Sequence, residues 1–296
     1  MKSRSNFLAL MLILSIGLVP TAQSSTETTT PSISTSTSEK SILETLSDYG
    51  SLNYYGIYRG SSISNMGSSF QPRVDGTLDP TSPSMLENLI TGAYKINKNW
   101  MVGAVGHFYF FPWSDPTGGG QRVQLLDPVV FISRPGLINS QGFRLDTRLT
   151  FQLPTSKFDA LVPRNLATAV SAVFNARYEV PSSKLTLGTF GLIRGYVPSG
   201  DTLPTAPTYA LTAAPYANYQ LTSNLQATIW IDLVQATRSP RSGFISGLQN
   251  APIDIEPGIS WDITKNITIN PVLNIYPTHP TLASTSIQAF IIAKAF

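Results

Sequence analysis

Apolar and polar residues alternate one by one along many short segments between residue 51 and the C-terminus, and turn-forming residues separate these segments. Successive side chains of a β-strand point to opposite faces, so a period of two predicts strands with one apolar and one polar face. In one segment, Leu145 and Leu149 lie on the apolar face and Asp146 lies on the polar face. Twelve strands are expected, over residues 51–64, 86–97, 99–112, 122–138, 143–154, 166–180, 185–197, 208–221, 225–237, 252–263, 267–277 and 285–296.

The connections between these strands fall into two classes that alternate along the chain. The tight connections cover residues 97–99, 139–142, 181–184, 222–224 and 264–266. The others are longer and rich in Pro, Gly and Ser, as at 65–85, 113–121 and 238–251. Outer-membrane barrels have short periplasmic turns and longer extracellular loops, whereas a soluble sandwich has little reason to separate its loops in this way. The sequence therefore predicts an all-β fold, a transmembrane antiparallel up-and-down β-barrel of about 12 strands, with a periplasmic N-terminus.

Composition excludes several other classes of protein. Mean hydropathy is +0.05, and outside the N-terminus no run approaches the roughly 20 apolar residues that a membrane-spanning helix needs. A 10% aromatic content is too high for a disordered chain. The absence of Cys excludes a disulfide framework and a thiolate metal site, and two His make a His-rich metal site a poor prediction. We expect no cofactor and no metal, and a net charge of +3 gives no support for nucleic-acid binding.

The N-terminus has the pattern of an export signal. Lys2 and Arg4 precede an apolar run over Phe7–Val19, and small residues suit cleavage before Ser25. Residues 1–24 are therefore expected to be a signal peptide, with an uncleaved signal anchor as the alternative. Residues 25–50 form a Ser/Thr-rich periplasmic leader with a short helix around Ile42–Leu46, which either plugs the lumen or is loosely ordered. Residues 51–296 form the barrel.

Charged residues on the strands indicate which face is internal. A charge facing lipid at mid-bilayer depth costs roughly 2–4 kcal/mol, so the polar faces are expected to point into the lumen. The candidate pore-lining residues are Arg144, Asp146, Arg148, Arg177, Arg194, Asp232, Asp254, Glu256, Asp262 and His107. The basic candidates belong to three consecutive strands and most acidic ones to two later strands, so we expect opposed charged walls across a wet lumen. The alternative is that the charges pair and close the lumen.

Several features indicate contact with a membrane and with its assembly machinery. Aromatic residues near the tight turns are expected to form an interfacial girdle. They are Tyr94, Trp100, Tyr178, Tyr219 and Trp261. The last strand ends on Phe296, which resembles the terminal strand that the barrel-insertion machinery reads in bacterial outer-membrane proteins, and Lys294 is expected to snorkel to the interface. The expected partners are outer-membrane lipids and lipopolysaccharide, the insertion machinery, and a small-molecule solute.

Two short motifs carry a family resemblance. Leu126-Asp127-Pro128 is followed, after a hairpin, by a strand that ends in Leu153-Pro154-Thr155-Ser156, and 197–201 repeats part of the second motif. The pattern resembles that of the meta-pathway (phenol-degradation) transporter barrels of Gram-negative outer membranes, in which the second motif reads Leu-Pro-Thr-Gly-Asp at the extracellular rim. Here Ser156 and Lys157 replace its Gly-Asp. The resemblance implies a barrel in the outer membrane with a permeation-type role.

Some barrels of this size are enzymes. Outer-membrane phospholipase A also has twelve strands, and it uses a His/Ser pair on its lipid-facing side. His107 shares a face with Val105 and Tyr109 and is expected in the lumen, while His279 lies in a loop. We therefore predict a non-enzymatic channel or porin-like barrel for small solutes. Two alternatives stay open: a non-conducting structural or surface-interaction barrel that acts through its loops, and an outer-membrane hydrolase.

Overall fold

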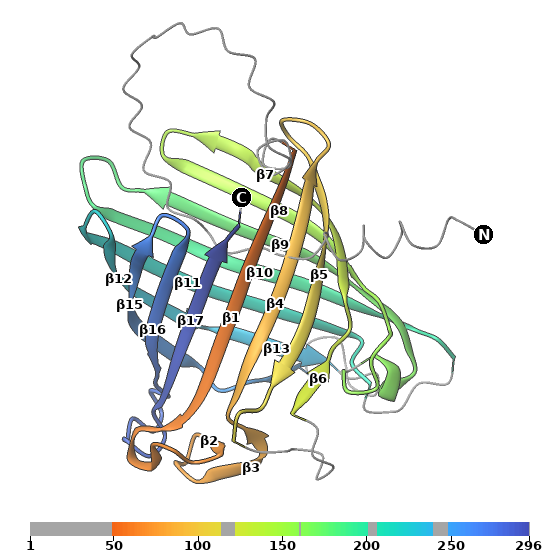
Figure 1. Cartoon of the computed structure of the whole chain (residues 1–296), viewed down its shortest axis with the longest axis vertical. Coiled ribbons are helices and arrows are strands. Elements are labelled where there is room, and N and C mark those ends of the chain that lie inside the picture. Colours follow the sequence, from red (N-terminus) through yellow and green to blue (C-terminus); the bar gives the residue numbers. More distant parts are fainter. Residues whose placement is uncertain (1–48, 114–121, 160, 201–205, 239–247, 296) are drawn as a thin grey trace, which may run out of the picture.

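The chain folds as a closed antiparallel β-barrel of 12 strands, as the sequence predicted (Figure 1). A computed structural model describes residues 49–113, 122–159, 161–200, 206–238 and 248–295. The expected signal peptide, nearly all of the leader and the terminal Phe296 lie outside the described residues, as does most of the 238–251 loop.

Each strand of the wall pairs with its neighbours in sequence, and the first pairs with the last. The wall strands are β1 (Gly50–Ser62), β4 (Met85–Lys95), β5 (Met101–Phe110), β7 (Val129–Ser140), β8 (Phe143–Gln152), β9 (Leu166–Glu179), β10 (Leu185–Pro198), β11 (Tyr209–Thr222), β12 (Leu225–Asp232), β15 (Asp254–Thr264), β16 (Ile267–Asn274) and β17 (Ser286–Lys294). Asn53 of β1 lies opposite Lys294 of β17, and this pairing closes the barrel. All backbone donors of the wall can then be satisfied within the chain.

Shorter elements extend the wall or lie in its connections. The strands β6 (Val123–Leu125), β13 (Val234–Arg238) and β14 (Leu248–Asn250) lengthen the wall at the long-loop end, and β2 (Phe70–Pro72) and β3 (Leu78–Pro83) form a hairpin. Two 3-10 helices cover Ile63–Asn65 and Val162–Arg164. No helix within the described part of the chain is long and apolar enough to cross a membrane.

The tight turns and the long loops lie at opposite ends of the barrel. In Figure 1 the end of β17 lies at the upper end, with the β4–β5 and β15–β16 turns, whereas the β2–β3 hairpin lies at the bottom. The β7–β8 turn is closed by Gln141 and Gly142, both with positive φ (49° and 81°), as a two-residue hairpin turn requires. We refer below to these ends as the turn end and the loop end.

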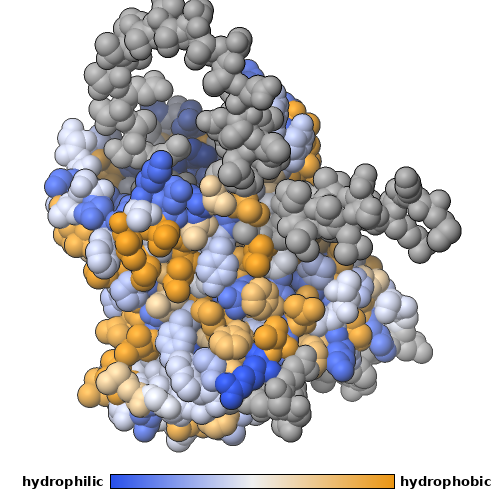
Figure 2. Space-filling model, in the orientation of Figure 1, coloured by the Kyte–Doolittle hydropathy of each residue, from blue (hydrophilic) through white to orange (hydrophobic). Residues whose placement is uncertain are grey.

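The two faces of the wall differ in chemistry as the alternation predicted. Outward residues such as Leu187 and Ile193 are exposed (43% and 56%), whereas the inward Phe131 and Tyr216 are buried (3% and 5%). In Figure 2 hydrophobic side chains cover much of the wall that faces the viewer. Water-soluble proteins rarely expose such large apolar surfaces, and a lipid-facing barrel needs an apolar band about 25 Å tall. The outer face is therefore that of a membrane-spanning barrel.

The aromatic residues near the tight turns all lie on outward positions. Tyr94, Trp100, Tyr178, Tyr219 and Trp261 have exposures between 36% and 51%. Tyr94 also stacks on Tyr49, with 6.4 Å between the ring centroids. Their placement is the one that an interfacial girdle requires, and the girdle itself stays a prediction.

The segment expected as one strand over 122–138 is split, because Asp127-Pro128 separates β6 from β7. Proline has no N–H to donate to the ladder, so the break falls where the sequence makes pairing costly. A second irregularity, between Arg134 and Ile138, contains Gly136 with φ +60°. Arg134 lies over the outward Trp100, 5.6 Å from the centroid of its ring, so it is directed away from the lumen.

The buried Asp127 fastens the β8–β9 connection to the wall. Its Oδ1 accepts hydrogen bonds from the backbone N–H groups of Thr155 and Ser156, both at 2.7 Å. The backbone N–H of Asp127 donates to Asp159 Oδ2 (3.0 Å), which also accepts from the inward Gln152 (3.1 Å). The two motifs that carried the family resemblance therefore meet in space and hold the connection on the inner side of the wall.

The same connection narrows the loop end of the lumen. Leu161 is fully buried and packs in a small apolar cluster with Leu166, Ala169 and Ala206, against which Tyr196 is placed. Ala169 and Tyr196 lie opposite each other on β9 and β10, on inward positions. The connection thus folds into the barrel.

We expect Asp127→Ala to release this connection without unfolding the barrel. Each hydrogen bond to a charged group contributes about 1.5–3 kcal/mol, so losing two of them frees the segment locally. Trypsin should then cleave the folded variant after Lys157 or Arg164, while the wild type resists, and heat-modifiable migration on gels would report that the barrel is intact. Asp75→Ala removes an exposed carboxylate in the β2–β3 connection that likewise accepts a backbone N–H, from Thr77, and serves as the control. Equal resistance of Asp127→Ala and the wild type would contradict the role given to Asp127.

Candidate functional site

All the pore-lining candidates lie on inward positions of the wall. The strand register gives the same face to Arg144, Asp146, Arg148, Arg177, Arg194, Asp232, Asp254, Glu256, Asp262 and His107. Cross-strand partners share a face, and the buried inward Phe131 fixes which face is internal. The role of these residues in lining a pore stays a prediction, but the structure brings several of them together.

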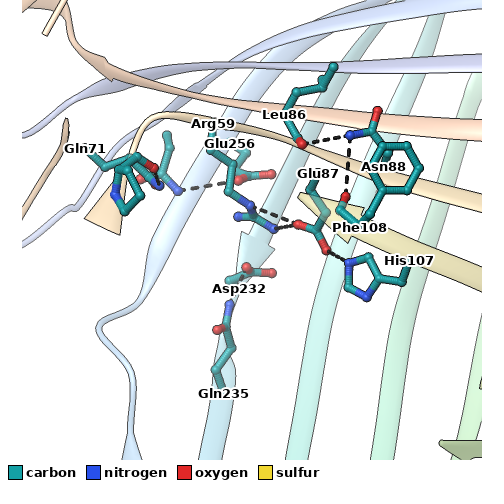
Figure 3. Close-up of polar contacts among 12 residues, drawn as sticks. Arg59, Gln71, Leu86, Glu87, Asn88, His107, Phe108, Asp232, Gln235 and Glu256 are labelled. Atoms are coloured by element: carbon teal, nitrogen blue, oxygen red, sulfur yellow. Dashed lines mark hydrogen bonds and ion pairs between the residues drawn. The ribbon is translucent and has the colours of Figure 1, made fainter. Parts of the chain in front are cut away.

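An ionic cluster formed by Arg59, Glu87 and His107 crosses the first three wall strands near the loop end. Arg59 donates to Glu87 Oε2 from Nη2 (3.1 Å) and from Nε (3.2 Å), and His107 Nε2 lies 2.9 Å from Glu87 Oε1. Figure 3 shows Glu87 between the other two side chains. The Glu87 side chain is only 13% exposed, and contacts with both neighbours satisfy its two oxygens. We call this group the Arg59–Glu87–His107 cluster.

Sequence reasoning found only His107 of this cluster. Arg59 and Glu87 are each in phase with apolar inward residues, Ile57 and Leu89, so each interrupts a pattern that reads as apolar. That interruption was a usable signal, because a single charge on a membrane strand requires a partner or water. What the sequence lacked was the register, in which Ile57 lies opposite Glu87 on the neighbouring strand.

An acidic group on β12 and β15 faces the same end of the lumen. Asp232 lies directly opposite Asp254, and Glu256 is two residues further along β15. Side-chain amides donate hydrogen bonds to these carboxylates: Asn274 Nδ2 donates to Asp254 (2.5 Å) and to Glu256 (3.4 Å), and Gln235 donates to Asp232. Amides carry no charge, so they hold these carboxylates in place without neutralising them. Arg59 acts on all three by electrostatic attraction.

Each end of the lumen contains a cavity. The loop-end cavity, of about 210 Å³, is lined by Arg59, Asp232, Asp254 and Glu256 together with uncharged polar residues such as Gln288. The turn-end cavity, of about 230 Å³, is lined by residues of seven strands and of two tight turns. Its charged residues are Arg177, Glu179, Lys184, Asp262, Lys265 and Lys294. Lys294 therefore lines the lumen, which corrects the expectation that it snorkels to the membrane interface.

Large inward side chains pack against one another between these cavities and at the inner edge of the turn-end cavity, which Tyr216 and Trp230 line. Tyr55 stacks on Phe290 (5.9 Å between centroids) and Tyr216 stacks on Trp230 (4.5 Å). The guanidinium of Arg148 lies 3.8 Å from the centroid of the Phe131 ring. A Cβ atom at Gly188 would collide with Tyr216, so glycine leaves the space that this ring occupies. The two cavities share no lining residue.

The other basic candidates are engaged along β8–β10. Arg144 donates from Nε to Asp146 Oδ1 at 2.9 Å, and Arg194 donates from Nε to Ser171 at 2.9 Å. Most acidic candidates lie on β12 and β15, away from the basic ones, but Asp146 shares β8 with Arg144, and this pair shows that part of the charge is compensated within one wall.

The histidines do not reproduce a lipid-facing catalytic pair. His107 is inward, bound to Glu87, and its ring packs edge-on against Tyr109 at 5.5 Å between centroids. His279 lies in the β16–β17 connection, where its backbone N–H donates to the carbonyl of Tyr276. The described residues contain no group of three or more His, Asp or Glu side chains that could hold a metal ion.

The β2–β3 hairpin carries charge outside the wall. Hydrogen bonds from the hydroxyl and backbone N–H of Thr77 lower the pKa of Asp75, and those from Thr81 lower the pKa of Asp79. Arg73 also pairs with Asp79, at 3.1 Å. Because both pKa values are lowered, these carboxylates stay ionised well into acidic conditions.

Comparisons with known proteins point to solved barrels alone. No family model matches the chain, and no curated protein matches it. The COG4313 outer membrane channel from Pseudomonas putida F1 is similar over 83% of this chain and 96% of its own, with a TM-score of 0.49 and 10% identity. The NanC porin is similar over 83% of this chain and 100% of its own, with a TM-score of 0.45 and 10% identity. The KdgM porin in complex with disordered oligogalacturonate is similar over 82% of this chain and 98% of its own, with a TM-score of 0.44 and 9% identity. The barrel assignment rests on the strand pairing of this chain.

The Arg59–Glu87 contact should contribute measurably to stability. In a double-mutant cycle of Arg59→Ala and Glu87→Ala, we expect a coupling energy of about 1–3 kcal/mol, since removing either partner leaves the other, a partly buried charge, without its counter-charge. Urea unfolding of the refolded protein in lipid vesicles, followed by tryptophan fluorescence, measures it. The exposed Arg73–Asp79 pair has the same N–O distance of 3.1 Å and is the matched control, for which a coupling below about 1 kcal/mol is expected. Equal coupling energies for the two pairs would refute the distinction.

Proposed function

We propose that this protein is an outer-membrane channel for the passage of small solutes. The observation that carries the proposal is a closed wall with an apolar outer face and a charged inner face that encloses a cavity at each end. Charges are retained within a membrane where they line a water-filled pathway or pair with each other. Pairing accounts for the Arg59–Glu87–His107 cluster, but the acidic group on β12 and β15 is held by amides, which favours a hydrated pathway.

The packed middle of the lumen favours a narrow pathway. Tyr55 and Phe290 lie between the two cavities, the Tyr216–Trp230 stack borders the turn-end cavity, and the β8–β9 connection reduces the width of the lumen at the loop end. A wide channel would leave its inward residues exposed to solvent, whereas inward residues such as Phe131 and Tyr216 are buried here. Such a lumen therefore suits ions and small polar molecules better than large ones.

Orientation and targeting complete the proposal. We place the loop end outside the cell and the turn end in the periplasm. The first wall strand begins and the last wall strand ends at the turn end. The signal segment 1–24 would direct export, and the final strand would be read by the barrel-insertion machinery. Outer-membrane lipids and lipopolysaccharide would contact the apolar band and its aromatic residues.

Planar-bilayer recording of refolded protein tests the proposal. We expect discrete conductance steps that scale with the amount of protein inserted. A variant lacking residues 25–48 distinguishes a lumen plugged by the leader from one closed by its own side chains. If neither form conducts although both insert, the proposal fails and a non-conducting barrel that acts through its loops becomes the better interpretation. Hydrolysis of lipid or peptide substrates that is lost in His107→Ala would favour the hydrolase instead.

The Tyr216 ring is expected to limit the conductance. Removing this buried inward ring in Tyr216→Ala widens the lumen beside Trp230, so single-channel conductance should increase, by about two-fold. Tyr219→Ala is the matched control, since Tyr219 is on the same strand but faces outward and is 48% exposed. An unchanged conductance in Tyr216→Ala, or an equal increase in both variants, would mean that the stack with Trp230 does not line the pathway.

A further inference from the structure

The two cavities of the lumen carry opposite net charge. In the loop-end cavity the carboxylates of Asp232, Asp254 and Glu256 face a single cation, Arg59. In the turn-end cavity four cations, Arg177, Lys184, Lys265 and Lys294, face two carboxylates, Glu179 and Asp262. The sequence predicted charge separation across the lumen, whereas the cavities show separation along its axis.

Local contacts leave the net charge of each cavity largely uncompensated. At the loop end the one cation is already engaged by Glu87, a carboxylate that is not among the lining residues, so the negative charge of the three lining carboxylates is only weakly offset. At the turn end Asp262 accepts a hydrogen bond from the Thr268 hydroxyl (2.6 Å), a neutral donor. The cations there come from four separate strands or turns, which distributes positive charge around the opening.

Low-dielectric walls make such charges effective. A narrow passage lined by one sign of charge focuses the field and raises the local concentration of counter-ions. The loop-end cavity therefore concentrates cations and the turn-end cavity concentrates anions. The Tyr55–Phe290 stack, together with the Tyr216–Trp230 stack at the inner edge of the turn-end cavity, separates the two populations.

We propose that this axial charge separation makes the barrel a rectifying channel, which conducts ions better under one polarity of voltage than under the other. When the voltage drives cations inward from the loop end, it also drives anions from the turn end, so each carrier enters through the cavity that concentrates it. Both then accumulate in the middle and the current is high. The reverse voltage draws both carriers out of the middle and the current falls. This inference rests on the proposed channel function and adds a direction to it.

The wild-type current–voltage curve is the first test. The full-length refolded protein is inserted into planar bilayers in symmetric potassium chloride. The chain has no Cys, so Met66→Cys, at a loop-end position that is 71% exposed, reports orientation through a membrane-impermeant thiol reagent added to one chamber. We expect the current to differ by about two-fold or more between opposite voltages at low salt, and the difference to shrink near 1 M salt, where the Debye length is about 3 Å.

Neutralising either end is the second test. Asp232→Asn with Glu256→Gln at the loop end, and separately Lys265→Gln with Lys294→Gln at the turn end, should each bring the current ratio toward one while conductance persists. Reversing the turn end with Lys265→Glu and Lys294→Glu should give a nearly symmetric, cation-selective channel. Lys98→Gln is the matched control, because Lys98 also lies in a tight turn but does not line the cavity, and it should keep the wild-type ratio.

The outcomes separate the two proposals. A channel that conducts with a symmetric current–voltage curve at low salt overturns the inference and leaves the proposed function intact. Rectification that is unchanged by all the lumen variants, or that is lost in Lys98→Gln, also overturns it. The absence of any current, both from the inserted full-length protein and from the inserted variant lacking residues 25–48, overturns both. Heat-modifiable migration confirms that each variant is folded, and the salt dependence of the wild type tests the inference without any substitution.

Discussion

A polypeptide that passes through lipid must satisfy every backbone hydrogen bond within itself, because the hydrocarbon offers no partner for an N–H or a carbonyl. In this chain the requirement is met by closure, with β1 paired to β17 on one side and to β4 on the other. The rest of the structure depends on this closure. It gives the wall an inside and an outside, and it confines the polar side chains of every strand to one enclosed space.

Closure also explains why the fold could be predicted so fully from the sequence. An open sheet can vary the solvation of its faces from strand to strand, but a closed wall imposes the same alternation on every strand. The apolar Leu145 and polar Asp146 therefore indicate an outward and an inward position, and Ile259 and Ser260 do the same in a different part of the barrel. Strand ends were predicted within a few residues, and the main departures fall at Asp127-Pro128 and near Leu233, where the wall strands are interrupted.

The contacts inside the lumen could not be predicted in the same way. Inward residues followed from the period of two, but their neighbours depend on register and on which strands meet at closure. Arg59, Glu87 and His107 come from three strands, and nothing in the sequence aligns them until Ile57 is placed opposite Glu87. The inward fold of the β8–β9 connection depends on hydrogen bonds from one carboxylate, that of Asp127, to backbone groups, which leave no trace in hydropathy.

The pairing of Asn53 with Lys294 also has a consequence for the order of assembly. These residues lie almost at the two ends of the barrel sequence, so the seam joins the strands that are synthesised first and last. Until β17 is in place, β1 has an edge of unpaired donors and acceptors that invites pairing with another chain. Joining segments this far apart in the sequence carries a larger loop-closure entropy cost than joining neighbouring strands by a tight turn. Protection of the β1 edge during transit is thus a requirement set by the topology itself.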